Sequence, residues 1–169
     1  MTTTVEKAPT AQKTPWTPPN GNWKTYDLHC HCGTIRYRMK LSPHLYEDEV
    51  TPEHPERCVA INCYCSYCAR NGQWTVHPLF GNVEWTKGLD HRGEYRIGEN
   101  KYPYGVCRKC CCFLGTDSRE LIKKLGFQEE VRCSINVRML KNFDQDKMSV
   151  RDARAMRDIG APYTVGDEQ

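Results

Sequence analysis

Three cysteines within six residues constrain this chain more than any other feature of its sequence. Cys63, Cys65 and Cys68 lie in the segment Asn-Cys-Tyr-Cys-Ser-Tyr-Cys-Ala-Arg-Asn-Gly, residues 62–72. Thiols this close can bind one metal ion together, since zinc takes cysteine sulfurs at about 2.3 Å. They cannot all pair as disulfides among themselves, because their number is odd and too few residues separate them. A metal held by three protein ligands keeps one coordination position open, and we expect the chemistry there.

Two cysteine pairs flank this group of three. Cys30 and Cys32 belong to Cys-His-Cys-Gly, and Cys107 and Cys110 belong to Cys-Arg-Lys-Cys. Structural zinc sites are normally closed by four ligands, whereas catalytic sites have three protein ligands and an open position. The most economical division therefore joins the two pairs in one closed site and leaves the group of three as an open site.

Spacing alone leaves a second division open. Cys112, Cys58 or a histidine can complete the group of three, which would give two purely structural sites. Otherwise Cys58 and Cys133 are predicted to be small core residues on buried faces of strands, and Cys111 and Cys112 remain unassigned. A disulfide framework is disfavoured for the 11 cysteines, because the N-terminus lacks the apolar core of a secretory signal and a reducing cytoplasm is expected.

The composition narrows the class of protein. The chain has 169 residues, of which 27% are charged and 38% hydrophobic, as in a globular domain with some disordered margin. A net charge of +3 without a Lys/Arg block gives little support to a nucleic-acid partner. No apolar run approaches membrane-spanning length, so no membrane is expected. The sequence shows no Ser-His-Asp order, phosphate loop or nucleotide fingerprint.

Short alternating segments predict an all-β fold of antiparallel strands. The expected strands cover residues 34–41, 58–61, 73–78, 83–87, 93–97 and 131–140. In the first of these, Ile35, Tyr37 and Met39 should face the core. Gly33 relieves the backbone just before it, which places Cys-His-Cys-Gly at a hairpin corner.

Three regions are expected along the chain. Residues 1–22 are rich in Thr, Pro and Lys and lack periodicity, which predicts a disordered tail. Residues 23–145 are expected to form the zinc-binding domain. Residues 146–169 are expected to form a C-terminal helix and tail, with the helix beginning at Ser149 and ending at Gly160.

Two further segments of the central region are predicted to be non-strand. Residues 42–57 are polar and carry three prolines, which predicts an irregular surface loop. Asp117 and Glu120 resemble a capping box, which predicts a two-turn helix that stops at Gly126.

The cysteine motifs resemble those of the glutathione-dependent formaldehyde-activating enzyme family, which includes centromere protein V. The likeness covers residues 25–144 and rests on four motifs in order: Cys-His-Cys-Gly, Cys-Tyr-Cys-Ser-Tyr-Cys-Ala-Arg-Asn-Gly, Cys-Arg-Lys-Cys and Ile-Asn-Val-Arg. The resemblance implies a zinc-centred β-tent of antiparallel sheets with two zinc ions per chain. It implies that a structural zinc is held by Cys30, Cys32, Cys107 and Cys110. It implies that a catalytic zinc is held by Cys63, Cys65 and Cys68.

The chain departs from the family pattern in two ways. Cys111 stands where the family usually has Gly after the second cysteine pair. Residues 42–57 and 117–130 look like additions. Both departures bear on the substrate more than on the fold.

Three thiolate ligands predict the kind of reaction. Together with Zn²⁺ they leave a net charge of −1, which disfavours hydroxide formation, and a sulfur-rich site suits an incoming thiol. We therefore expect a carbon–sulfur lyase with glutathione as co-substrate, acting on a thiol adduct of a small carbonyl or of a secondary-pathway intermediate. The alternative is a non-catalytic zinc module that binds protein or nucleic acid, and a homodimer is compatible with either function.

Glutathione carries two carboxylates, so its site needs cationic or amide donors. Arg70 and Asn71 follow the group of three directly and are the first candidates; Arg138, together with Asn136, is the second. The alternative interpretation is that Arg70 is a solvated surface charge and that the other pair satisfies sheet edges. Tyr104 is predicted either to line a pocket or to pack in a strand.

Overall fold

The computed structural model describes residues 22–53, 55–97, 102–117 and 132–159. The expected disordered tail and the helix predicted to end at Gly126 therefore lie almost entirely outside the described residues. Within them, two sheets make up most of the structure, one of three strands and one of seven, and the all-β prediction is confirmed. No helix among these residues is long and apolar enough to cross a membrane.

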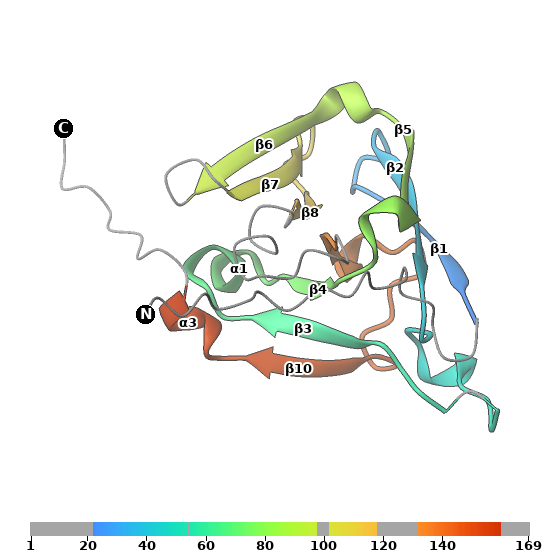
Figure 1. The fold of residues 1–169 in the computed structure, drawn as a ribbon. Helices are drawn as coiled ribbons and strands as arrows, with labels where there is room; N and C mark the ends of the chain where they lie inside the picture. Colours follow the sequence, from blue (N-terminus) through green and yellow to red (C-terminus); the bar gives the residue numbers. More distant parts are fainter. Residues whose placement is uncertain (1–21, 54, 98–101, 118–131, 160–169) are drawn as a thin grey trace, which may run out of the picture.

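The two sheets differ in their number of strands. The three-stranded sheet, in the order β1–β2–β5, consists of β1 (Lys24–His29), β2 (Arg36–Leu41) and β5 (Val83–Lys87). The seven-stranded sheet, in the order β10–β3–β4–β9–β8–β7–β6, consists of β3 (Val59–Cys63), β4 (Trp74–Val76), β6 (Arg92–Ile97), β7 (Tyr102–Cys107), β8 (Phe113–Thr116), β9 (Ser134–Asn136) and β10 (Ser149–Ala153). Figure 1 shows β1 and β2 standing across one end of the molecule, with β3 and β10 on one side and β6 and β7 on the other.

Short helices connect the strands. They are η1 (Glu47–Glu49), α1 (Ser66–Asn71), η2 (Phe80–Asn82), η3 (Leu89–His91), η4 (Val137–Met139) and α3 (Met156–Ile159). Among them α1 follows β3 and lies between the two halves of the long sheet (Figure 1).

The β1–β2 hairpin follows the alternation of its sequence. Lys24 pairs with Leu41 and His29 with Arg36 in antiparallel register, and the side chains of β2 alternate between exposed and buried. The corner carries Cys30 to Ile35, and Gly33 takes a left-handed conformation there with a φ of 67°. The predicted hairpin corner is therefore confirmed.

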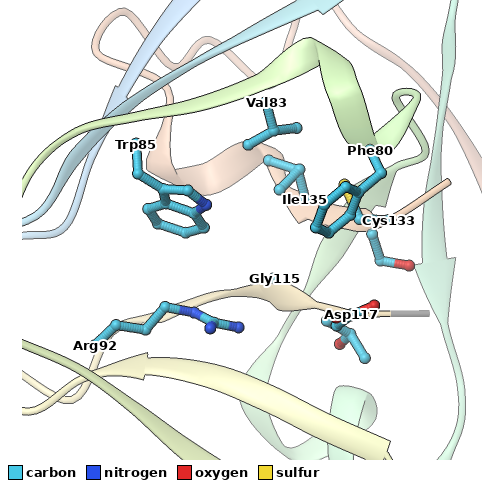
Figure 2. A pocket seen from close by; sticks show the side chains of 10 residues that line it. Phe80, Val83, Trp85, Arg92, Gly115, Asp117, Cys133 and Ile135 are labelled. Atoms are coloured by element: carbon cyan, nitrogen blue, oxygen red, sulfur yellow. The ribbon is translucent and has the colours of Figure 1, made fainter. Parts of the chain in front are cut away.

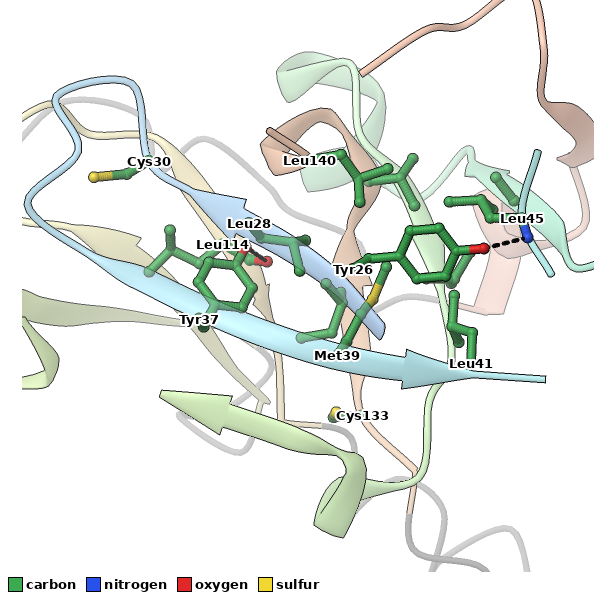
Figure 3. Close-up of a cluster of buried hydrophobic side chains, with 14 of the residues drawn as sticks. Tyr26, Leu28, Cys30, Tyr37, Met39, Leu41, Leu45, Leu114, Cys133 and Leu140 are labelled. Carbon is green, nitrogen blue, oxygen red and sulfur yellow. Dashed lines mark hydrogen bonds between the residues drawn. The ribbon is translucent and has the colours of Figure 1, made fainter. Parts of the chain in front are cut away.

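The core lies beneath this hairpin (Figure 3). Tyr37 is fully buried, and its hydroxyl donates a hydrogen bond of 3.2 Å to the carbonyl oxygen of Leu114 in the other sheet. The Tyr26 hydroxyl accepts a hydrogen bond of 2.8 Å from the backbone N–H of Leu45. Buried apolar side chains thus join the two sheets, and these two buried hydroxyl groups have hydrogen-bond partners.

The polar loop of residues 42–57 is irregular apart from η1, in keeping with the prediction. Glu49 fastens it to β1, since its carboxylate binds both the Lys24 ammonium and the Tyr26 hydroxyl. Burial raises the pKa of Glu49, but the hydrogen bonds from these two groups outweigh it and leave the pKa below its usual value.

The helix predicted from Ser149 is wrong over its first half. Residues Ser149–Ala153 form β10, which pairs in parallel with β3 from Ser149↔Val59 to Ala153↔Cys63, and only Met156–Ile159 are helical. The sequence pattern fits a helix as well as a strand, but the edge of β3 offers unpaired backbone groups, and this tertiary partner overrides the local preference.

The long strand predicted for residues 131–140 is also wrong. Only Ser134–Asn136 form a strand, after which η4 begins. The Asn136 side chain caps this turn by accepting a hydrogen bond of 3.2 Å from the Arg138 N–H, and it donates one of 3.0 Å to the Phe113 carbonyl oxygen. The remaining strand predictions agree with β3, β4, β5 and β6, whose centres lie within the expected ranges.

Candidate metal sites

The first candidate site contains four cysteines from two distant turns. The Sγ atoms of Cys30, Cys32, Cys107 and Cys110 all lie within 4.8 Å of one another. Cys32 Sγ lies 3.5 Å from Cys30 Sγ and 3.8 Å from Cys107 Sγ. Sulfurs at the corners of a tetrahedron with metal bonds of about 2.3 Å lie about 3.8 Å apart. This four-cysteine group therefore fits one tetrahedral metal ion.

Local backbone structure positions these thiols. Cys30 and Cys32 occupy the β1–β2 corner, where the N–H of Ile35 points to Cys30 Sγ at 3.3 Å. Cys107 ends β7, and its N–H donates to the Cys112 carbonyl oxygen at 2.9 Å across the turn to β8. Each turn brings two thiols together, and the tertiary structure then joins turns that are 75 residues apart.

The four thiols differ in their tendency to ionise. The Thr34 hydroxyl lies 3.2 Å from Cys32 Sγ, and this contact lowers the pKa of the exposed Cys32 thiol to about 6. Burial raises the pKa of Cys30 to about 12. For Cys110, burial raises the pKa but hydrogen bonds from the Cys112 and Cys32 backbone outweigh it. A bound metal ion would favour the thiolate form of all four.

The second candidate site is built from one continuous segment. Cys63 ends β3, Cys65 is the N-cap of α1, and Cys68 lies in the first turn of that helix. Their Sγ atoms all lie within 4.8 Å of one another, and no fourth His, Cys, Asp or Glu of the described residues joins them. We call these residues the three-cysteine group.

Hydrogen bonds within the three-cysteine group favour one thiolate. The Cys63 and Cys68 thiols donate to Cys65, which lowers the pKa of Cys65 well below its usual value. Contacts with Cys63 and Cys65, together with burial, raise the pKa of Cys68. The Cys68 backbone N–H also points to Cys65 Sγ at 3.4 Å, which stabilises negative charge on that sulfur.

Aromatic side chains from three elements enclose the three-cysteine group. Tyr67 of α1 lies against Tyr104 of β7, with ring centroids 4.3 Å apart, and against Phe113 of β8 at 5.9 Å. Tyr104 and Phe113 are buried with Cys65 and Cys68 in one apolar cluster. Burial and the neighbouring cysteine sulfurs raise the pKa of Tyr104, whose hydroxyl hydrogen-bonds to Cys65. That hydroxyl therefore stays protonated beside the sulfurs.

Two arginines near the C-terminal end of the described residues lie beside Tyr64. The Arg154 and Arg157 guanidinium carbons lie 5.7 Å and 5.9 Å from the ring centroid of Tyr64, which stands between two of the three cysteines in the sequence. The Tyr64 hydroxyl donates a hydrogen bond of 3.0 Å to Asp152, and Met156 packs against the cysteine cluster. Sequence reasoning missed these residues because it placed residues 146–169 outside the zinc-binding domain.

Comparison with known proteins gives the fold but no family. No protein-family model matches the chain, and no curated protein matches it. A solved Rhodobacter sphaeroides protein, a target of the Northeast Structural Genomics effort, is similar in structure with a TM-score of 0.52 and 18% sequence identity. The match covers 74% of this chain and 99% of that chain. At this identity the likeness concerns the fold alone.

The first two predicted substrate contacts lie in the last turn of α1. Arg70 Nη1 donates a hydrogen bond of 2.7 Å to the Ser66 carbonyl oxygen, and Asn71 Nδ2 donates one of 2.9 Å to that of Tyr67. Both side chains are exposed. In this structure they bond to the helix that carries them, and their role toward a substrate stays a prediction.

Arg138 is engaged in holding the same segment. Its Nε donates a hydrogen bond of 2.7 Å to the carbonyl oxygen of Gly72, which ends α1 in a left-handed conformation with a φ of 58°. Its guanidinium also lies over the Trp74 ring, at 4.6 Å from the centroid. These contacts fix the end of α1, while binding of a substrate carboxylate by Arg138 stays a prediction.

The remaining cysteines stand outside both groups. Cys133 is buried in the core, as predicted, and the partly buried Cys58 packs against that core. Neither lies in a strand as expected, because Cys58 precedes β3 and Cys133 precedes β9. Cys111 is exposed, and Cys112 lies beside Cys110 without belonging to the four-cysteine group. Among the described residues, therefore, neither Cys58 nor Cys112 nor a histidine completes the three-cysteine group, which is the arrangement that the alternative division required.

Proposed function

We propose that the protein is a zinc-dependent carbon–sulfur lyase that acts on the glutathione adduct, or a related thiol adduct, of a small carbonyl or of a secondary-pathway intermediate. The observation that carries this proposal is the three-cysteine group, in which three sulfurs converge without a fourth ligand-type side chain from the described residues. A zinc site with three protein ligands has a position for an external ligand. The four-cysteine group, in contrast, has the ligand number of a structural site.

The donor set favours a thiol substrate. When bound to three thiolates, a zinc ion supplies a soft Lewis-acid position that suits an incoming sulfur better than water. The chain contributes the surroundings: Tyr67, Tyr104 and Phe113 cover the cysteines with aromatic rings and limit the access of water. The Tyr104 hydroxyl beside Cys65 is a hydrogen-bond donor for a polar atom at the site.

The neighbouring arginines support an anionic substrate. Glutathione carries two carboxylates, and guanidinium groups bind carboxylates with two parallel hydrogen bonds. Arg154 is well exposed, with 76% of its side chain accessible, and it shares Asp152 with Tyr64. The Arg157 guanidinium group also lies over the Tyr64 ring, 5.9 Å from its centroid. Both are therefore additional candidates to bind the carboxylates, beside Arg70, Asn71 and Arg138.

Turnover of a labelled adduct tests the proposal. Glutathione and ¹³C-formaldehyde equilibrate with their hydroxymethyl adduct, and the exchange rate can be measured by NMR with and without the zinc-loaded protein. We expect Cys65→Ser to reduce the catalysed rate by more than the ~10- to 100-fold that loss of an outer-shell partner of a metal costs. Cys111→Ser is the matched control, because Cys111 is an exposed thiol outside both groups, and it should leave the rate unchanged.

Glutathione conjugates of larger carbonyls extend the same measurement. Undiminished turnover in Cys65→Ser would contradict the proposal for any of these substrates. Absence of turnover for every conjugate, combined with two metal ions that resist chelation equally, would instead favour a non-catalytic zinc module.

A further inference from the structure

A partly open cavity lies away from both cysteine groups. It has a volume of about 180 Å³ and is bordered by β5, β6, β8, β9 and η2 (Figure 2). None of the seven clustered cysteines is among its lining residues. An engineered apolar cavity of about 150 Å³ is known to hold one benzene molecule. The volume therefore suits a ligand of about one six-membered ring with a small substituent.

Most of the cavity wall is apolar. Val83 and Trp85 of β5 line one side, and Phe80 of η2 and Ile135 of β9 lie beside them on that side (Figure 2). Phe80 is among the exposed large hydrophobic residues, with an accessibility of 41%. A ring can thus contact several apolar side chains on this side of the cavity.

One cationic side chain faces this apolar wall. Arg92 of β6 also lines the cavity, and its guanidinium carbon lies 5.5 Å from the Trp85 ring centroid. Its Nε is buried and has no hydrogen-bond partner among the described residues. The side chain as a whole is still 23% exposed. The outer part of the guanidinium group is therefore open to an acceptor in the cavity.

Two acidic side chains lie near Arg92. Glu94 Oε1 lies 3.4 Å from Arg92 Nη1, a long contact, while Glu94 Oε2 accepts a shorter bond of 2.7 Å from Arg96. Asp117 lies at the opposite end of the cavity from Arg92 (Figure 2) and has an interaction of its own. Gly105 of β7 lets the guanidinium lie against the sheet, since a Cβ there would stand 2.8 Å from Arg92 Nε.

We infer that this cavity binds a small carboxylate whose apolar body is about the size of one ring, with the carboxylate on Arg92 and the ring against Trp85 and Val83. The charge of Arg92 selects the carboxylate, and the volume and wall select the body. The inference does not depend on the proposed function, because it uses no residue of the three-cysteine group.

Benzoate is the probe for this site. Titrated into the full-length protein, it should shift the indole N–H signal of Trp85 in ¹H–¹⁵N NMR spectra to saturation, and Trp85→Phe identifies that signal. Benzyl alcohol keeps the ring but lacks the charge, so we expect it to bind at least about tenfold more weakly, since hydrogen bonds to charged groups are the strong ones. Acetate, which lacks the ring, should give no saturable shift.

Two variants of one strand separate Arg92 from general charge effects. Arg92→Gln should weaken benzoate binding about tenfold or more, whereas Arg96→Gln should leave it unchanged, because Arg96 is exposed and outside the cavity lining. Equal binding of benzoate and benzyl alcohol, or no saturable shift at millimolar benzoate, would overturn the inference. These ligand comparisons use the wild-type protein and remain decisive if Arg92→Gln does not fold.

Discussion

Both cysteine groups offer thiol side chains as metal ligands, but one is assembled from distant segments and the other from a single segment. The four-cysteine group joins a corner of the three-stranded sheet to a turn of the seven-stranded sheet, and its members are drawn from segments 75 residues apart. The three-cysteine group comes from one β-strand and the helix that follows it. A metal bound to the first group would connect the sheets, whereas a metal bound to the second would connect residues that are already neighbours.

The surroundings of the two groups differ accordingly. Cys32 of the four-cysteine group is exposed. It lines a wide surface hollow together with His31 and Arg36. Around the three-cysteine group, Tyr104 and Phe113 are buried with the sulfurs. Ligand number and sequence separation thus distinguish a site suited to hold the fold from one suited to hold a ligand, although both groups have buried members.

The largest expected effect concerns folding. Cys107→Ser removes a ligand that is fully buried where the two sheets meet, so we expect it to lower the free energy of unfolding by about 4 kcal/mol or more, as loss of a structural metal does. Cys68→Ser should cost only about 1 to 2 kcal/mol, because it replaces one thiol in a locally formed turn. Urea unfolding followed by circular dichroism, with metal content measured in parallel, tests the contrast. The exposed Cys111→Ser is the control, and equal losses at Cys107 and Cys68 would break the distinction.

The second prediction concerns metal release. We expect up to two metal ions per chain and biphasic transfer to a colorimetric chelator, with the three-cysteine group losing its ion first because one coordination position is open to attack. Circular dichroism should stay native through the fast phase and change in the slow phase. Cys65→Ser should remove the fast phase alone. A single phase that accompanies unfolding would show that the two groups hold metal alike.

The third prediction concerns the hydroxyl beside the open site. Tyr104→Phe keeps the ring packing against Tyr67 and Phe113 but removes the hydrogen bond to Cys65. We expect a stability loss of only about 0.5 to 1.5 kcal/mol, together with a reduction of turnover of roughly tenfold. Tyr95→Phe is the control, since Tyr95 stacks on Tyr67 from the exposed side. Unchanged turnover in Tyr104→Phe would show that Tyr104 contributes only to packing.

The smallest expected effect concerns substrate charge. The double variant Arg154→Gln, Arg157→Gln should raise KM for a glutathione adduct severalfold with little change in kcat, as expected for exposed ionic contacts worth about 0.2 to 1 kcal/mol each. The effect should diminish at high salt. Arg70→Gln provides the comparison, because Arg70 bonds to its own helix. A larger increase in KM for Arg70→Gln than for the double variant would indicate that the substrate carboxylates bind to the residues that follow the cysteines in the sequence.

Local patterns in the sequence predicted local structure well. The alternation of Ile35, Tyr37 and Met39 matched their burial in and beside β2, and the strand at Val83–Lys87 has the expected limits. The cysteine pairs and the group of three also lie in the tight turns that their spacing suggested. Each of these features depends on residues close in the chain.

Features that depend on distant partners were predicted less well. Val150 and its neighbours have a helical pattern, yet they form β10 because β3 has an open edge beside them. The strand predicted for residues 131–140 stops at Asn136, whose side chain bonds to Phe113 of another strand and caps the turn. In both cases the local conformational preference contributes less free energy than the tertiary hydrogen bonds do. The tertiary contact therefore decides the secondary structure.

The sequence by itself determined the all-β class, the β1–β2 corner and the two kinds of cysteine cluster, because hydrophobic alternation and ligand spacing are local properties. It left open which cysteines share a site. Only the tertiary structure brought the 30/32 and 107/110 pairs together, placed Arg154 and Arg157 beside Tyr64, and formed the cavity at Arg92. The physical reason is that these arrangements are set by strand pairing and packing between distant segments, which no local pattern encodes.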